Sequence, residues 1–231
     1  MTKIEASIGR VHGDRYLPIS NALEDFVGHP PRVENLQGWA GPNDLLQIIM
    51  DWESWRTFAT LGAGIFGAAA VGKLGQSIAG DSYDALKRLV SRASPSEAKS
   101  TDSEKFERLE RAIKDAIADG YAVTLSIPTG GQFRNNLGIE LTSGDLAQIL
   151  DASAILGEIG QDLRHAIESE EQSGQKVYGA AHGNRDGGPK IERLKDGSLA
   201  IRLGLEKDGQ SVPLTIQYDR NGKRIKQLPP T

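Results

Sequence analysis

The segment from Thr57 to Gly80 is rich in glycine and alanine, and it restricts the possible folds of this chain more than any other segment. It carries one charged residue, Lys73, and the glycines Gly62, Gly64, Gly67, Gly72, Gly75 and Gly80. A glycine in an exposed helix costs about 1 kcal/mol relative to alanine, so six of them cost on the order of 5 kcal/mol. The glycines therefore predict that another surface packs closely against the backbone of this segment.

Three small residues of the segment recur at every fourth position. They are Gly64, Ala68 and Gly72. On a helix this spacing gives the small-xxx-small pattern that lets two backbones approach closely, and it is best known between transmembrane helices. We expect these three residues to form a helix-contact face, either with a second copy of the chain or with a partner protein.

The length of the segment bears on whether a membrane is involved. A helix over Thr57–Gly72 spans about 24 Å, which is shorter than the ~30 Å hydrocarbon core of a bilayer. A longer span includes Lys73, which then has to reach the membrane interface. Trp52 and Trp55 precede the segment, where an aromatic belt would lie. The membrane interpretation assigns these two tryptophans and Lys73 to the interface.

Two other interpretations of the segment remain open. In the first, the glycines pack a helix pair, or form a glycine-broken loop, inside the core of a domain. In the second, Gly62, Gly64 and Gly67 form a Gly-x-Gly-x-x-Gly loop that holds a phosphate group. The second needs a buried strand directly before the glycines, and residues 56–60 are a poor candidate for one.

The rest of the chain shows alternating helix and strand signals. Apolar spacing predicts helices over residues 16–27, 44–55, 103–120 and 143–170. Alternation predicts strands over 4–11, 32–39, 121–127, 137–141 and 177–181. Three regularly spaced turns, Lys195-Asp196-Gly197, Lys207-Asp208-Gly209 and Arg220-Asn221-Gly222, predict a C-terminal antiparallel meander.

These elements predict an α+β protein. The expected order is an N-terminal βαβ-like unit, a central Gly/Ala-rich apolar helix, a hairpin, a long helix and the meander. We expect a small α+β unit over residues 1–53, the glycine-rich helical segment over 54–93, a linker over 94–102, and an α+β domain over 103–231. The linker is small, polar and contains proline.

Composition and motifs offer little support for a reaction. The net charge is −4 and cysteine is absent, which excludes disulfides and thiolate metal sites and makes nucleic acid an unexpected partner. His12, Asp14 and His182 could form a ligand or acid–base site if the fold brought them together. His165 near Glu168 fits an exposed helix end. We expect no metal and no cofactor.

The segment WESWRTFATLGAGIFGAAAVGKLGQSIAGDSYDALKRLV (residues 52–90), together with the order of the elements, resembles small accessory proteins of bacterial conflict systems, of the effector-associated constant component type. The resemblance covers residues 1–170 by order of elements. It implies a non-enzymatic part of a bacterial defence or signalling system that works with other proteins. The chain departs from that pattern in its helix over 103–120 and its added meander.

Taken together, these features predict a non-enzymatic module that self-associates or associates with a membrane, for example an accessory or effector in antiphage defence. The first alternative is a soluble protein-interaction scaffold whose glycine-rich helix packs in its own core. The second is a ligand-binding protein or an enzyme. The N-terminus has no apolar core typical of a secretory signal, so the expected location is the cytoplasm, with the inner membrane as a site of association.

Overall fold

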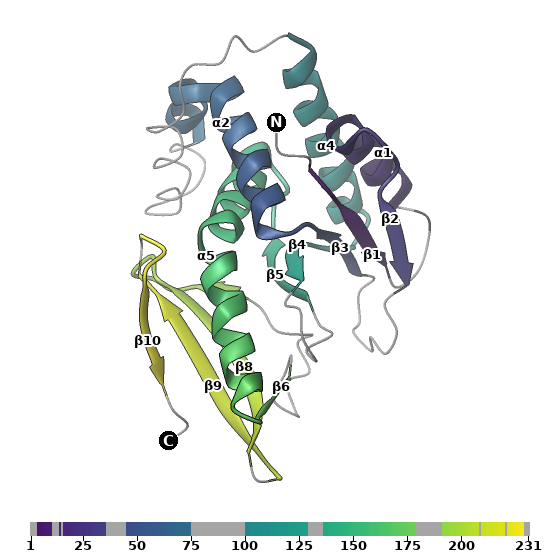
Figure 1. Cartoon of the computed structure of the whole chain (residues 1–231). Helices are drawn as coiled ribbons and strands as arrows, with labels where there is room; N and C mark the ends of the chain where they lie inside the picture. The colour runs from purple at the N-terminus through teal and green to yellow at the C-terminus, as the bar shows by residue number, and fades with distance from the viewer. Residues whose placement is uncertain are drawn as a thin grey trace.

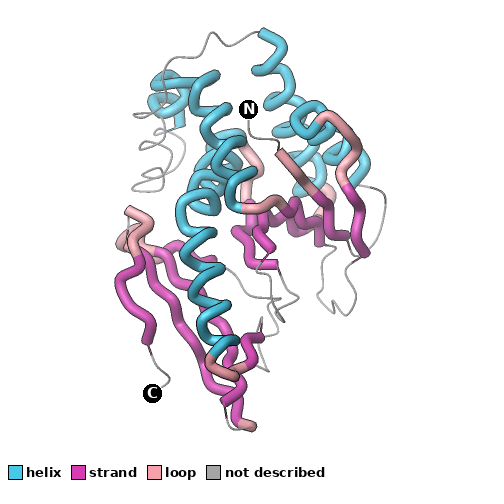
Figure 2. The backbone as a smooth tube through the Cα atoms, in the orientation of Figure 1, coloured by secondary structure: helices cyan, strands magenta, loops and turns pink. Residues whose placement is uncertain are grey.

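The structure is a computed structural model that describes residues 4–10, 14, 16–35, 45–74, 100–128, 136–178, 191–207, 209–219 and 221–228. Within these ranges helices combine with two five-stranded sheets, which confirms the predicted α+β class (Figures 1 and 2). The helices are α1 (Tyr16–Val27), α2 (Trp52–Leu74), α4 (Ser100–Ala118) and α5 (Leu146–Gln172). The strands are β1 (Ser7–Arg10), β2 (Arg32–Asn35), β3 (Leu45–Ile49), β4 (Ala122–Pro128), β5 (Asn136–Leu141), β6 (Lys176–Tyr178), β7 (Ile191–Arg193), β8 (Leu199–Lys207), β9 (Gln210–Tyr218) and β10 (Arg224–Leu228).

The first sheet has the strand order β2-β1-β3-β4-β5. β1 and β2 are joined through α1 and pair in parallel, which confirms the N-terminal βαβ unit. β3 and β4 also pair in parallel, whereas β1 with β3 and β4 with β5 pair antiparallel. Strands β1 to β3 belong to residues 1–53, and strands β4 and β5 belong to residues 103–231. Both segments of the chain therefore contribute strands to this one sheet.

One face of the first sheet carries apolar side chains and is covered by helices. Ile8 of β1 pairs in register with Ile48 of β3, which pairs with Leu125 of β4, so the three side chains lie in one row. All three belong to a core cluster that includes residues of α1, α2, α4 and α5. Figure 1 shows the same arrangement, with the helices gathered on one side of the strands.

Helix α1 illustrates how local sequence sets these elements. Its buried residues include Ile19, Leu23 and Val27, which recur at four-residue spacing and form one apolar face. Gly28 ends the helix with φ +79°, a conformation that glycine adopts without strain, and its N–H donates to the carbonyl of Glu24. The bounds of this helix are those that the sequence predicts.

The second sheet is the predicted meander. Its order is β10-β9-β8-β6, and β7 also pairs with β8. Every pairing in it is antiparallel, and the turns before β8, β9 and β10 contain Gly197, Gly209 and Gly222, all with positive φ. Figure 1 shows this sheet along the C-terminal half of α5, whereas α2 and the first sheet lie beside its N-terminal half.

The helix predicted over residues 44–55 is wrong. Leu45–Ile49 form β3, and α2 begins only at Trp52. β3 is buried on both faces and lies between β1 and β4, so nearly every residue in it is apolar. A short continuous apolar run of this kind does not distinguish a central strand from a buried helix, and the branched Ile48 and Ile49 favour the strand.

Two helix starts also differ from the predictions. α4 begins at Ser100, inside the expected linker, and residues 94–99 lie outside the described ranges. The helix predicted from residue 143 begins at Leu146 as α5, and Asp145 is its N-cap, since the Asp145 carboxylate accepts a hydrogen bond from the backbone N–H of Gln148 at 2.9 Å. Residues 75–93 of the expected glycine-rich helical segment lie outside the described residues.

Candidate functional site

The expected contact residues all lie on α2, the Gly/Ala-rich helix. The helix begins where Asp51 accepts a hydrogen bond from the N–H of Ser54 at 2.7 Å, a typical N-cap. Gly64, Ala68 and Gly72 follow in its second half. Gly64 is half-buried. The glycines of the Gly-x-Gly-x-x-Gly pattern are therefore helical, and they do not form the loop that a phosphate site of that type needs.

Glycine-mediated packing does occur on α2, at a position that the four-residue pattern does not include. A Cβ at Gly62 would lie 2.3 Å from Cδ2 of Leu150 on α5. At the other end of the same contact, a Cβ at Gly160 of α5 would lie 2.6 Å from Cβ of Trp52. The numbering rises on one helix as it falls on the other, so α2 and α5 pack antiparallel and in close contact.

The main chains of the two helices come close together at Gly157 of α5. A Cβ at this position would lie 2.8 Å from both the N and Cα atoms of Arg56. Those are backbone atoms, so the glycine is what allows the two main chains to meet there. Glycine thus allows close packing between α2 and α5, through Gly157 and Gly160 of α5 and through Gly62 of the glycine-rich segment.

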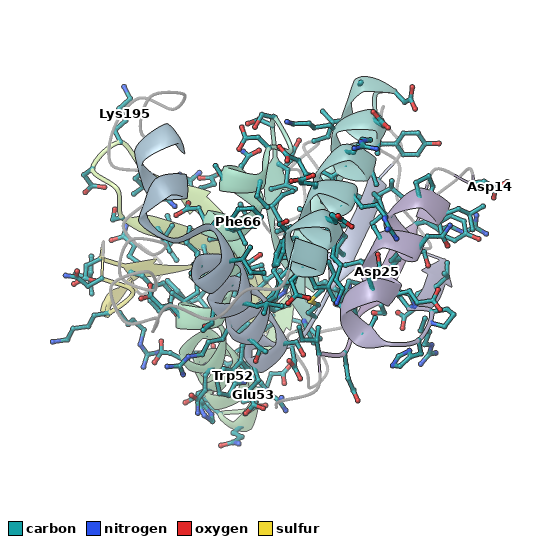
Figure 3. All side chains as sticks on the ribbon, turned by 90° about the horizontal axis from the view of Figure 1, so that it is seen from above. Asp14, Asp25, Trp52, Glu53, Phe66 and Lys195 are labelled. Carbon is teal, nitrogen blue, oxygen red and sulfur yellow. The ribbon has the colours of Figure 1, made fainter. Side chains whose placement is uncertain are left out.

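The tryptophans assigned to a membrane interface occupy different environments. Trp55 is 1% exposed, and its indole N–H donates to the carbonyl of Ser126 on β4 at 2.8 Å. An anchor at a bilayer surface needs an accessible ring, so this conformation does not present Trp55 to lipid. Trp52 is half-buried against α5, and Figure 3 shows it beside Glu53 at the start of α2. Lys73 lies near the end of α2.

An aromatic cluster holds α2 against its neighbours. Phe58 of α2, Phe26 of α1 and Phe106 of α4 have ring centroids 4.8 to 5.0 Å apart, mostly edge to face. Phe66 contacts Phe106 at 5.6 Å and Trp55 contacts Phe58 at 6.0 Å. Figure 3 shows Phe66 between α2 and α4. The larger apolar residues of the glycine-rich helix thus pack into the core of this chain.

Within the residues that the structure describes, no helix has both the length and the apolar character needed to cross a bilayer.

The other face of the first sheet carries a group of polar side chains that the sequence analysis did not single out. We call it the polar sheet face, and its residues in this argument are Gln47, Thr124, Ser126, Asn136 and Gly138. The register places Gln47 beside Thr124, and Ser126 beside Gly138. The Asn136 amide donates to Oε1 of Gln47 at 3.2 Å.

The polar sheet face is buried, although it lies apart from the core. Ser126 is 0% exposed and Thr124 is 7% exposed. Leu45 and Ile49, which point to the same face of β3, are also buried, yet neither belongs to the core cluster. The hydroxyl oxygens of Thr124 and Ser126 have no hydrogen-bond partner. The alternation around residues 121–127 is the only sequence signal for this face. Such alternation predicts that the polar side chains of the strand are exposed to water.

The loop residues considered for ligand binding are not brought together by the described structure. His12 and His182 lie outside the described ranges. Asp14 is exposed, 3.4 Å from Arg10. His165 is also exposed and lies 3.7 Å from Glu168, whose carboxyl pKa is lowered by the hydrogen bond from Arg164. No group of His, Asp and Glu residues suited to a metal ion occurs in the part of the chain that the structure describes.

Polar side chains of α5 bond to the strands of the second sheet. The hydroxyl of Tyr218, on β9, donates to the carboxylate of Asp162 at 2.9 Å, and Arg224 lies 3.5 Å from the same oxygen. Burial, together with the Asp162 charge, raises the pKa of the Tyr218 hydroxyl. Nearer the N-terminus of α5, Arg193 of β7 donates a hydrogen bond to Asp151. These bonds fasten β7, β9 and β10 to the helix.

No known protein family, curated protein sequence or solved structure matches this chain.

Proposed function

We propose that this chain is a self-associating module in which Gly64, Ala68 and Gly72 of α2 form the contact face for a second copy. The observation that carries the proposal is that α2 packs against α5 through Gly62, a residue outside the small-residue stripe.

The geometry of an α-helix supports this assignment. Successive residues advance by about 100°, so position 64 lies about 200° around the helix from Gly62, and positions 68 and 72 lie about 240° and 280° around it. Glu53 and Thr60, which an ideal helix places within about 40° of Gly64, are exposed. The stripe therefore starts at a half-buried position beside the exposed side of α2.

The cost of glycine supports the proposal as well. Gly62 is explained by its contact with Leu150. An ideal helix places Gly64 about 200° around the axis from that contact, and a glycine in the interior of a helix costs about 1 kcal/mol relative to alanine. A second helix that packs against the stripe offsets that cost, because small residues allow the two backbones to approach closely.

A protein partner is favoured over a membrane by the placement of the aromatic residues. Trp55, Phe58 and Phe66 pack against the core of the chain. Insertion of α2 into lipid would have to withdraw these rings from the core. The role in bacterial defence that the family resemblance implies remains a prediction from that resemblance.

The test is to measure the mass of the protein in solution over a range of concentrations, by light scattering and sedimentation. We expect the wild-type chain and Gly64→Ala to form the same oligomer, because alanine keeps the position small. Gly64→Leu should lower the association constant at least tenfold. A circular dichroism spectrum identical to that of the wild type confirms that the leucine variant is folded.

Two outcomes contradict the proposal. One is a wild-type chain that stays monomeric at every concentration. The other is an oligomer whose stability Gly64→Leu does not change. A flotation assay with liposomes covers the membrane alternative, since protein that floats with the vesicles and loses this property in Gly64→Leu identifies lipid as the partner.

A further inference from the structure

Two buried hydroxyl groups on β4 point to a binding site on the polar sheet face. Thr124 and Ser126 are two residues apart, so their side chains lie on the same face of the strand. Both oxygens are buried without a hydrogen-bond partner. A buried polar group left in this state costs about 1 to 3 kcal/mol, and native proteins rarely keep one without a reason.

The position of the Ser126 hydroxyl is fixed by its surroundings. The Ser126 carbonyl accepts hydrogen bonds from the Trp55 indole at 2.8 Å and from the N–H of Met50 at 3.1 Å, which hold the backbone in place. On the neighbouring strand, a Cβ at Gly138 would lie 2.4 Å from the hydroxyl oxygen. Glycine at this position therefore leaves the space that the hydroxyl occupies over β5.

Two side-chain amides lie on the same face. Asn136 and Gln47 share one hydrogen bond, from the Asn136 amide nitrogen to the Gln47 oxygen. The Gln47 amide nitrogen and the Asn136 oxygen keep their own capacity to donate and to accept. Together with the two hydroxyls, these amides give one face of strands β3, β4 and β5 both donors and acceptors of hydrogen bonds.

The chemistry of the face is uncharged on its central strands. The described residues of β1, β3 and β4 that point to it are Ser7, Gly9, Leu45, Gln47, Ile49, Ala122, Thr124, Ser126 and Pro128. None of them is ionisable, and the one ionisable residue of β5 on this face, Glu140 beside Thr124, is exposed. The Glu140 charge disfavours an anion, and the buried hydroxyls carry no charge that would bind an ion, whereas an uncharged molecule can bond to the hydroxyls and amides.

We propose that the polar sheet face binds a small uncharged molecule that both donates and accepts hydrogen bonds, with Thr124 and Ser126 as the binding residues. Polyols and carboxamides share this chemistry. The site lies on the first sheet and the proposed self-association on α2, so the two proposals are independent of each other.

The test is a titration of the full isotope-labelled chain with D-ribose and, separately, with acetamide, followed by two-dimensional ¹H–¹⁵N NMR. We expect saturable shifts in the amide signals of Thr124, Ser126 and Gly138 and in the indole signal of Trp55, which bonds to this strand. Saturation by ribose alone identifies a polyol site, saturation by acetamide alone identifies a carboxamide site, and saturation by both supports the shared chemistry.

Variants assign the binding to the hydroxyls. Thr124→Val and Ser126→Ala remove one hydroxyl each with little change of shape, and each should weaken binding about tenfold, the equivalent of one hydrogen bond. Ser54→Ala is the matched control, because Ser54 is also a buried serine but its hydroxyl already accepts from the N–H of Glu5 at 3.1 Å. Its affinity should equal that of the wild type.

Two results overturn the proposal. The first is that neither compound produces saturable shifts at these signals up to about 100 mM, where even millimolar affinities saturate. The second is that the shifts persist with unchanged affinity in both Thr124→Val and Ser126→Ala.

Discussion

Replacement of Gly157 by alanine tests the packing of α2 against α5 directly. The new methyl group would lie 2.8 Å from the N and Cα atoms of Arg56. Backbone atoms of a helix cannot rotate out of the way as a side chain can. The two helices therefore have to move apart, and Gly157→Ala disturbs the contact along its whole length.

The magnitude follows from two opposing effects. Alanine in place of glycine inside a helix stabilises it by about 1 kcal/mol. Overpacking costs about 1 to 3 kcal/mol, and the upper end applies here because the obstacle is main chain. We expect Gly157→Ala to lower the free energy of unfolding by about 1 to 2 kcal/mol, the difference between the two effects.

Two other glycines provide the comparison. At Gly62 the obstacle is the end of the Leu150 side chain, which can change rotamer, so Gly62→Ala should leave the free energy of unfolding nearly unchanged. At Gly64, a half-buried position beside the exposed side of α2, alanine should raise it by about 1 kcal/mol. The three substitutions are chemically identical, so the surroundings of each glycine determine the order of the effects.

The assay is urea unfolding of each variant at one protein concentration, followed by circular dichroism, with the free energy obtained by linear extrapolation. Equal slopes against urea confirm that the variants unfold from comparable states. The reasoning is refuted if Gly157→Ala is as stable as the wild type, or if Gly64→Ala destabilises the chain as much as Gly157→Ala does.

Two further predictions concern buried hydroxyl groups. Ser126→Ala should raise the free energy of unfolding by about 1 kcal/mol, because it removes a buried hydroxyl that has no hydrogen-bond partner, whereas Ser54→Ala should lower it by about 1 kcal/mol, because it leaves the N–H of Glu5 unpaired; urea unfolding measures both. The pKa of Tyr218 is raised above its usual 10.0 by burial and by the Asp162 charge, so the folded chain holds this proton more tightly than the unfolded chain does. The stability from this group is therefore present below pH 10 and is lost as the pH rises above it, and unfolding measured up to about pH 11 should depend less on pH in Tyr218→Phe than in the wild type.

Several elements of the fold can be predicted from the sequence, because a few neighbouring residues determine them. The turns at Gly197, Gly209 and Gly222 pair a polar residue with a glycine that adopts positive φ, so the meander follows from turn geometry alone. Helix α1 likewise has a regular apolar face and a glycine at its end. These features act over a few residues and do not depend on distant parts of the chain.

The features that could not be predicted depend on contacts between distant residues. β3 is apolar on both faces because it lies between β1 and β4, and β4 comes more than 70 residues later in the sequence. Gly62 contacts Leu150 on α5, whereas the four-residue pattern within α2 includes Gly64 and not Gly62. The small residues of α2 predicted a close helix contact, but they could not identify which glycine makes it.

The polar sheet face was missed for a related reason. Alternation of apolar and polar residues predicts a strand with one face in the core and the other in water. Thr124 and Ser126 fit that pattern, yet both are buried. Burial of the polar face depends on the tertiary structure around β4, and the strand's own sequence carries no signal for it.

Helix α5 explains why the two sheets and α2 form one structure. From the position of Gly157, which faces α2, an ideal helix places Asp151 and Asp162 about 120° to 140° around the axis. Those two carboxylates bond to Arg193 and Tyr218 of the second sheet. The apolar residues between these two sides are buried as well, so the N-terminal half of α5 is enclosed nearly all round, whereas Arg164 and His165 in its C-terminal half are exposed. Separation of either α2 or the second sheet would expose this helix, and the proposed contact face on α2 is therefore coupled through α5 to the C-terminal meander.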